Sequence, residues 1–124
     1  MKGYLLDEHV PIALGLHLVR QEPSIELSRV GDGIAPSLSA SDPELLRWIE
    51  AHDRVLVTNN RSTMPAHLES HLASGGHVPG IVQLPRLVSI AAIVADLVLL
   101  WSAASPEEIR DRIIYLPLYR EDLT

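Results

Sequence analysis

Two groups of polar residues follow segments that have the composition of buried strands. Asp7 comes directly after the apolar run 3–6, and the uninterrupted polar run 58–63 follows the apolar residues 55–57. In an open parallel sheet, ligands bind outside the carboxyl ends of the strands, so these polar groups are expected at one edge. Carboxylates at such an edge suit Mg²⁺ or Mn²⁺, which take oxygen ligands and keep several waters. Such an ion can generate hydroxide and neutralise a phosphoryl transition state.

Asp7 and Asp42 are the candidate metal ligands, and each has a purely structural alternative. Asp7 either binds a metal ion or caps the helix expected to begin near Pro11. Asp42 opens a helix that leads towards the next strand, beside Ser41 and before Pro43, where a capping residue is expected. Glu8 either supports the site or is simply exposed.

The polar run after residue 57 is a candidate for binding phosphate. Thr58, Asn59 and Asn60 can bind phosphate or hold a metal-bound water, and the Arg61 guanidinium can clamp a phosphate through two hydrogen bonds. The alternative is an ordinary turn, because Asn and Ser are frequent turn residues. The residue types leave both interpretations open.

The histidines do not form a recognisable catalytic motif. His67 and His71 are four residues apart on an expected helix, a spacing that can place two imidazoles on one metal ion. They lack the glutamate of an H-E-x-x-H motif, so a solvated helix face is favoured. No glycine-rich phosphate loop and no Ser/His/Asp arrangement is recognisable.

Expected strands and helices alternate through the whole sequence. The expected strands lie at 3–7, 25–30, 54–58, 80–84 and 113–118, and the helices at 11–21, 41–49, 64–74 and 89–104, with a short helix from 105. Short apolar strands joined by helices predict a mainly parallel sheet of about five strands with helices on both faces. Residues 25–30 are polar enough to predict a strand towards the edge of the sheet.

Composition limits the classes of protein that fit. The 124 residues predict one domain, 1–124, and a hydrophobic content of 47% predicts a folded chain with a well-filled core. The absence of cysteine excludes disulfides and thiolate metal sites and, with no secretory signal expected before Asp7, favours a cytoplasmic protein. The apolar run 87–101 is too short for a membrane span and predicts a buried or partner-facing helix. The net charge of −6 excludes a basic surface all round, so nucleic-acid binding requires a local arginine patch, a metal ion or a basic partner.

Four blocks of sequence, in order, resemble a bacterial PIN-like family of small proteins, often toxins of toxin–antitoxin pairs. The blocks are L-L-D-E-H-V-P at 5–11, S-A-S-D-P-E-L-L at 39–46, R-V-L-V-T-N-N-R at 54–61 and P-G-I-V-Q-L at 79–84. The resemblance implies a three-layer α/β/α fold and a Mg²⁺- or Mn²⁺-dependent ribonuclease site of clustered carboxylates. It assigns the first acid to Asp7 and the acid that opens the following helix to Asp42. Asn60 and Ser62 stand where two further acids are usual, which removes two negative charges from the site.

Three hypotheses follow from these residues. The first is a metal-dependent endoribonuclease, held in check by an antitoxin protein, in which Asp7 and Asp42 bind the metal, Asn60 assists and Arg61 contacts the RNA. The second is a PIN-like module without activity that binds RNA or a protein partner, with the 89–101 helix as a homodimer or partner surface. The third is a receiver-like signalling domain, which is disfavoured because Asn59 and Asn60 stand where a phospho-acceptor Asp is expected.

Overall fold

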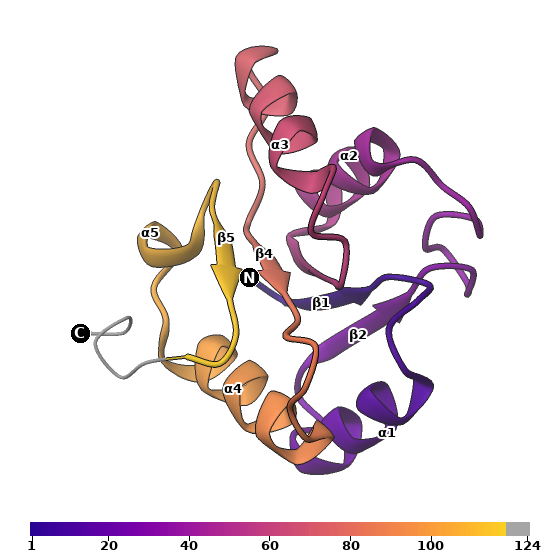
Figure 1. Cartoon of the computed structure of the whole chain (residues 1–124), viewed down its shortest axis with the longest axis vertical. Helices are drawn as coiled ribbons and strands as arrows, with labels where there is room; N and C mark the ends of the chain where they lie inside the picture. Colours follow the sequence, from indigo (N-terminus) through magenta and orange to yellow (C-terminus); the bar gives the residue numbers. More distant parts are fainter. Residues whose placement is uncertain (119–124) are drawn as a thin grey trace.

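The computed structural model describes residues 1–118 as five strands and five helices (Figure 1). The strands form one sheet in the order β2-β1-β3-β4-β5, and every neighbouring pair is parallel. The strands are β1 (Gly3–Leu6), β2 (Glu26–Arg29), β3 (Arg54–Thr58), β4 (Ile81–Gln83) and β5 (Ile113–Tyr115). The helices are α1 (Ile12–Gln21), α2 (Asp42–His52), α3 (Met64–Ala73), α4 (Ile90–Ala103) and α5 (Pro106–Ile109). The predicted three-layer α/β/α class is confirmed.

Two apolar clusters cover the two faces of the sheet. Helices α1 and α4 contribute to the cluster on one face, and α2 and α3 contribute to the cluster on the other. All residues of β1 and β4 are buried, as expected for strands covered on both sides. Strand β2 is exposed or half-buried throughout and lies at the edge of the sheet, as its polar sequence predicted.

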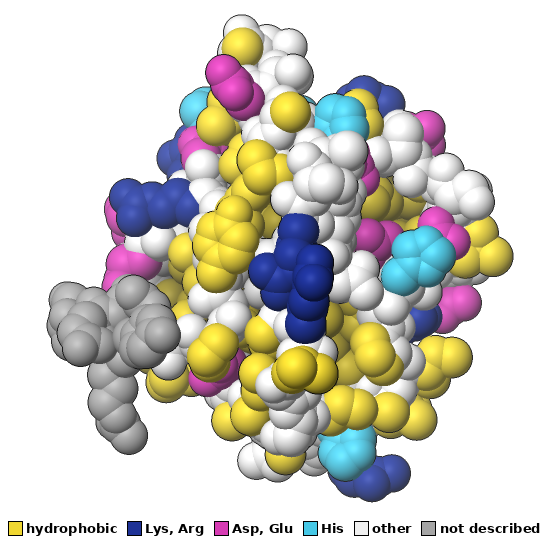
Figure 2. All heavy atoms as spheres, in the orientation of Figure 1, with side chains coloured by type: hydrophobic (Ala, Val, Ile, Leu, Met, Phe, Trp, Pro, Cys, Tyr) yellow, Lys and Arg dark blue, Asp and Glu magenta, His cyan; other side chains and the backbone are white. Residues whose placement is uncertain are grey.

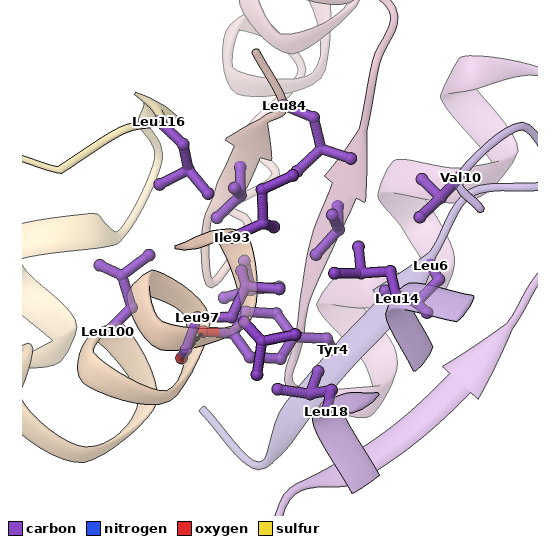
Figure 3. Close-up of a cluster of buried hydrophobic side chains, with 14 of the residues drawn as sticks. Tyr4, Leu6, Val10, Leu14, Leu18, Leu84, Ile93, Leu97, Leu100 and Leu116 are labelled. Atoms are coloured by element: carbon purple, nitrogen blue, oxygen red, sulfur yellow. Dashed lines mark hydrogen bonds between the residues drawn. The ribbon is translucent and has the colours of Figure 1, made fainter. Parts of the chain in front are cut away.

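Tyr4 connects the central strand β1 to helix α4. Its side chain is fully buried and its hydroxyl donates a hydrogen bond to the Leu97 carbonyl at 2.6 Å. Figure 3 shows the Tyr4 ring beside Leu97 within the apolar cluster between the sheet and α4. Burial raises the pKa of Tyr4 far above its usual value, because the charged phenolate is poorly solvated there, so the hydroxyl remains a donor.

The buried face of helix α1 differs from the one that the sequence predicts. The helical spacing of Ile12, Leu16 and Val19 predicts that they share a face, but all three side chains are exposed to solvent. The buried residues are Leu14, Gly15 and Leu18. At position 15, a Cβ atom would lie 3.1 Å from a methyl group of Leu6, so glycine allows this close packing on β1.

The apolar composition of α4 is largely explained by packing within the chain. Ser89 caps the helix by accepting a hydrogen bond from the Ala92 N–H, and Ile93, Val94, Leu97 and Leu100 are buried. In the part of the chain that the structure describes, no helix is long and apolar enough to cross a membrane. A homodimer through this helix stays a prediction.

Candidate functional site

The candidate site lies where the carboxyl ends of β1 and β3 meet. After β1 the chain continues into α1 on one face of the sheet, and after β3 it continues into α3 on the other (Figure 1). Such a divergence at the carboxyl ends of neighbouring parallel strands is where open α/β sheets bind ligands. The register pairs Leu6 with Val57, and the Asp7 N–H donates to the Val57 carbonyl at 3.0 Å. Asp7 is therefore next to Thr58.

The Asp7 carboxylate is held by two hydrogen bonds at the end of β1. Its Oδ1 accepts from the Glu8 N–H at 2.8 Å, and its Oδ2 accepts from the Thr58 hydroxyl at 2.9 Å. The first residues of α1 receive no side-chain cap. The alternative that Asp7 caps this helix is therefore wrong, and two of about four acceptor positions on the carboxylate stay open.

Asp42 is also free of a capping role, because Ser41 performs it. The Ser41 hydroxyl accepts from the Glu44 N–H at 3.3 Å. One oxygen of Asp42, Oδ2, accepts three hydrogen bonds from outside its own helix. The donors are Asn60 Nδ2 at 3.0 Å, Thr63 Oγ1 at 2.9 Å and, when that nitrogen carries the proton, His67 Nδ1 at 2.7 Å. The Asp42 side chain is 15% exposed, so this oxygen is firmly held.

Asn60 joins the two carboxylates and forms a turn at the same time. Its backbone N–H donates to the Thr58 hydroxyl at 3.1 Å, and its amide nitrogen reaches Asp42. Its amide oxygen accepts from the backbone N–H groups of Ser62 and Thr63, both at 3.2 Å. The turn interpretation of this run is therefore confirmed. One continuous hydrogen-bond network also runs from Asp7 through Thr58 and Asn60 to Asp42.

A divalent ion fits this arrangement only with a small set of protein ligands. Among residues 1–118, no group of three or more His, Cys, Asp or Glu side chains is placed to hold a metal ion. Mg²⁺ commonly uses one or two carboxylates and completes its shell with water and substrate phosphate. Asp7 and Asp42 supply two carboxylates at this edge of the sheet, whereas the Asn60 oxygen is turned towards the backbone. Metal binding at Asp7 and Asp42, and help from Asn60, stay predictions.

The residues expected to contact substrate lie in different environments. Thr58 has no exposed surface, so its hydroxyl positions Asp7 and does not reach a substrate, and the prediction of direct contact is wrong for this residue. Asn59 and Arg61 are exposed and line a cavity beside the network. Arg61 Nη2 donates to the Leu84 carbonyl at 2.8 Å, which fixes its guanidinium at the end of β4.

Glu8 has a structural role. Its carboxylate accepts a hydrogen bond from the Ser39 N–H at 2.7 Å, and so fastens the long loop before α2 to the end of β1. Arg29 fastens the same region from β2, since its Nη2 donates to the carbonyls of Glu8 and Val10. The Glu8 carboxylate is therefore directed at this loop and not at Asp7.

The histidines of α3 bind separate carboxylates on α2. His67 pairs with Asp42, and His71 Nε2 lies 2.7 Å from the Glu50 carboxylate. The two imidazoles therefore do not share a metal ion. The expectation of a solvated helix face is wrong for His71, whose side chain is only 13% exposed because it packs against α2.

A third histidine–carboxylate pair lies at the other edge of the sheet. His77 Nδ1 is 2.8 Å from Asp111 Oδ2, and the Val78 N–H donates to Asp111 Oδ1 at 2.8 Å. Burial acts to raise the pKa of Asp111, but these hydrogen bonds and the nearby His77 and Arg110 outweigh it and hold the pKa below its usual value.

Sequence reasoning missed four residues of this region. Thr63 and His67 bind Asp42, Gln83 is a buried polar residue that pairs in register with Thr58, and Arg86 lines the cavity beside Arg61. Gln83 had a signal, because it is a polar residue inside an otherwise apolar strand. The others depend on how α2, α3 and the segment after β4 pack together, which local sequence does not reveal.

Comparison of this chain with protein-family models, with curated proteins and with solved structures finds no significant match. The resemblance to the PIN-like family therefore rests on the four sequence blocks quoted above.

Proposed function

We propose that this protein is a divalent-metal-dependent ribonuclease of PIN-like type. The observation that carries the proposal is the network in which Thr58 and Asn60 join Asp7 to Asp42 at the carboxyl ends of the two central strands. Two carboxylates at that edge are the ligands that Mg²⁺ or Mn²⁺ requires when water and substrate complete the shell. The four sequence blocks give independent support for the same chemistry.

Each residue has a distinct part in this proposal. Asp7 and Asp42 would hold the metal ion, which when bound supplies an activated water and neutralises charge on the phosphate. Thr58 holds the Asp7 carboxylate in position through a buried hydrogen bond. Arg61, anchored on Leu84, presents its remaining N–H groups to a phosphate. Asn59 is exposed beside it for a further polar contact.

The test is cleavage of a pool of fluorescently labelled RNA in millimolar Mn²⁺. We expect metal-dependent cleavage by the wild type and its loss in Asp7→Asn, which keeps the shape of the side chain but removes its charge. Glu8→Gln is the matched control, because Glu8 is directed at the loop before α2 and should leave cleavage in place. Equal cleavage by the wild type and Asp7→Asn, or none by a folded wild type, would refute the proposal.

A second candidate is a PIN-like module that binds RNA or a protein without cleaving. The observation that favours it is the crowding of Asp42 Oδ2 by three donors, which already stabilise its charge without a cation. In this case, we expect RNA binding without cleavage and no rise in melting temperature with Mn²⁺.

The proposed toxin role requires a protein antitoxin as partner. We expect such a partner to co-purify with the chain from its own cells and to suppress the cleavage described above. RNA cleavage that is unchanged when the co-purified protein is added back would contradict this part of the proposal.

A further inference from the structure

A cavity of about 550 Å³ lies beside the carboxylate network, between the end of β4 and the start of α4. Arg61 borders it from the segment after β3, and Arg86 borders it from the segment after β4. Figure 2 shows Lys and Arg side chains gathered near the centre of this face, over the end of β4 and the chain that follows it. The cavity volume falls within the range of sites that bind small molecules.

The charged side chains that line the cavity are arginines, although the protein as a whole is acidic. No Asp or Glu is among its lining residues, and within residues 1–118 neither Arg61 nor Arg86 forms an ion pair. By contrast, Arg54 pairs with Glu26 at 3.2 Å. Two guanidinium groups without acidic partners at one cavity, in a chain of net charge −6, favour a ligand with negative charge.

The start of α4 adds to the same field. Ile90, the first residue of α4, lines the cavity, and the first turn of this 14-residue helix contains no acidic side chain. The amino end of a helix carries a partial positive charge and free N–H groups, which attract anions. Part of the remaining wall is apolar and includes Leu84, Val88 and Ile93, and polar side chains of His9, Asn59 and Ser62 complete the lining.

We propose that this cavity binds the terminal, phosphorylated nucleotide of an RNA strand. This inference rests on the proposed ribonuclease function and names the part of the substrate that the site recognises. A terminal phosphate monoester carries close to two negative charges at neutral pH, which matches two guanidinium groups, whereas an internal phosphodiester carries one. The phosphate lies between Arg61 and Arg86, and the ribose and base lie against the apolar wall. The remainder of the strand extends past Asn59 towards Asp7.

The test measures binding without catalysis. Three forms of one short RNA, with a 5′-phosphate, with a 3′-phosphate and with hydroxyls at both ends, are titrated by fluorescence anisotropy in EDTA. Charge-assisted hydrogen bonds contribute about 1.5–3 kcal/mol, so we expect one phosphorylated form to bind at least about tenfold more tightly than the hydroxyl form. The end that shows this preference identifies the polarity of the bound strand.

Arg86→Gln should reduce that preference to less than about threefold. Arg20→Gln is the matched control, because it makes the same charge change at an exposed position at the end of α1 and should retain the preference. Equal binding of all three RNA forms, or a preference that Arg86→Gln leaves intact, would overturn the inference.

The two proposals fail in different ways. A preference for phosphorylated RNA in EDTA, with no cleavage in Mn²⁺, would support the cavity and refute the ribonuclease. Cleavage in Mn²⁺ without any preference in EDTA would refute the cavity and leave the ribonuclease intact.

Discussion

Asn60→Asp is the most informative single change, because the structure isolates its effect to one atom. The amide oxygen of Asn60 accepts from two backbone N–H groups, and a carboxylate oxygen accepts them equally well. The amide nitrogen donates to Asp42 Oδ2 at 3.0 Å and to the Thr63 hydroxyl at 2.7 Å, and the substitution replaces it with a second carboxylate oxygen. The stabilising hydrogen bond to Asp42 therefore becomes a repulsion, while the backbone hydrogen bonds of the turn are retained.

The size of the effect follows from that distance. Two unit charges 3.0 Å apart repel by about 5.5 kcal/mol at an effective dielectric constant of about 20. Rotation of the carboxylates to a separation of about 4–8 Å reduces this to roughly 2–4 kcal/mol. At about 4 °C per kcal/mol for a domain of this size, we expect the melting temperature to fall by roughly 8–16 °C at pH 7 in EDTA.

A divalent ion should reverse most of this loss if residues 42 and 60 border a metal site. Mn²⁺ at a concentration 100-fold above its dissociation constant contributes about 2.7 kcal/mol, or roughly 10 °C. We therefore expect Mn²⁺ to raise the melting temperature of Asn60→Asp by clearly more than that of the wild type, measured by differential scanning fluorimetry.

Asn59→Asp provides the control, since it adds the same charge one residue earlier. Asn59 is exposed, and the one hydrogen bond of its amide within residues 1–118 goes to the His9 carbonyl, at 3.3 Å. If Asn60→Asp is no less stable than Asn59→Asp in EDTA, the amide does not face Asp42 as described. If Mn²⁺ stabilises Asn60→Asp no more than the wild type, residues 42 and 60 do not form a metal site.

Three further changes test the positions of buried and paired groups by urea denaturation. Thr58→Val should destabilise the fold by about 2–4 kcal/mol, because it removes the hydrogen bond to Asp7 and leaves the Asn60 N–H without its acceptor. Thr58→Ser keeps the hydroxyl and should cost about 1 kcal/mol. Equal losses in the two variants would show that the hydroxyl contributes nothing. Tyr4→Phe should cost about 1 kcal/mol through loss of the bond to Leu97, and an unchanged midpoint would argue against that bond. The pKa of Asp111 is lower in the folded state than in the unfolded state. Ionised Asp111 therefore stabilises the fold above the unfolded pKa of about 3.9, and this stabilisation is lost as pH falls through the folded pKa. Asp111→Asn should lower the free energy of unfolding at pH 7, and that free energy should fall less than the wild type's on acidification to pH 3.

The fold was largely predictable from the sequence because its strands and helix starts carry strong local signals. The run 54–58 is buried and central, and the S-D-P-E string begins α2 with Ser41 as its cap. The buried face of α1 was not predictable, because two apolar stripes compete on that helix. Gly15 lies on the buried stripe and allows close contact with Leu6, which only the packed structure reveals.

The two carboxylates of the candidate site were predictable from the sequence, but the hydrogen bonds that connect them were not. Asp7 and Asp42 were identifiable because they follow a strand and open a helix. Neither carboxylate caps a helix, because hydrogen bonds from other helices, strands and loops hold it, such as the bond from Thr58 to Asp7. The same holds for His67, which reaches Asp42 across the α2–α3 packing and has no signature in the sequence around it.

The bond between Asp7 and Thr58 joins residues 51 positions apart in the chain. The intervening segment contains α1, β2 and α2, so β1 and β3 pair only after a long loop has closed, at an entropic cost that grows with loop length. The two carboxylates therefore come together only when the centre of the sheet has formed. A chain emerging from the ribosome holds Asp7 from the start, but it has no assembled site until β3 is complete and docked. Any activity of this site thus requires that β1 and β3 have paired, and global unfolding abolishes it.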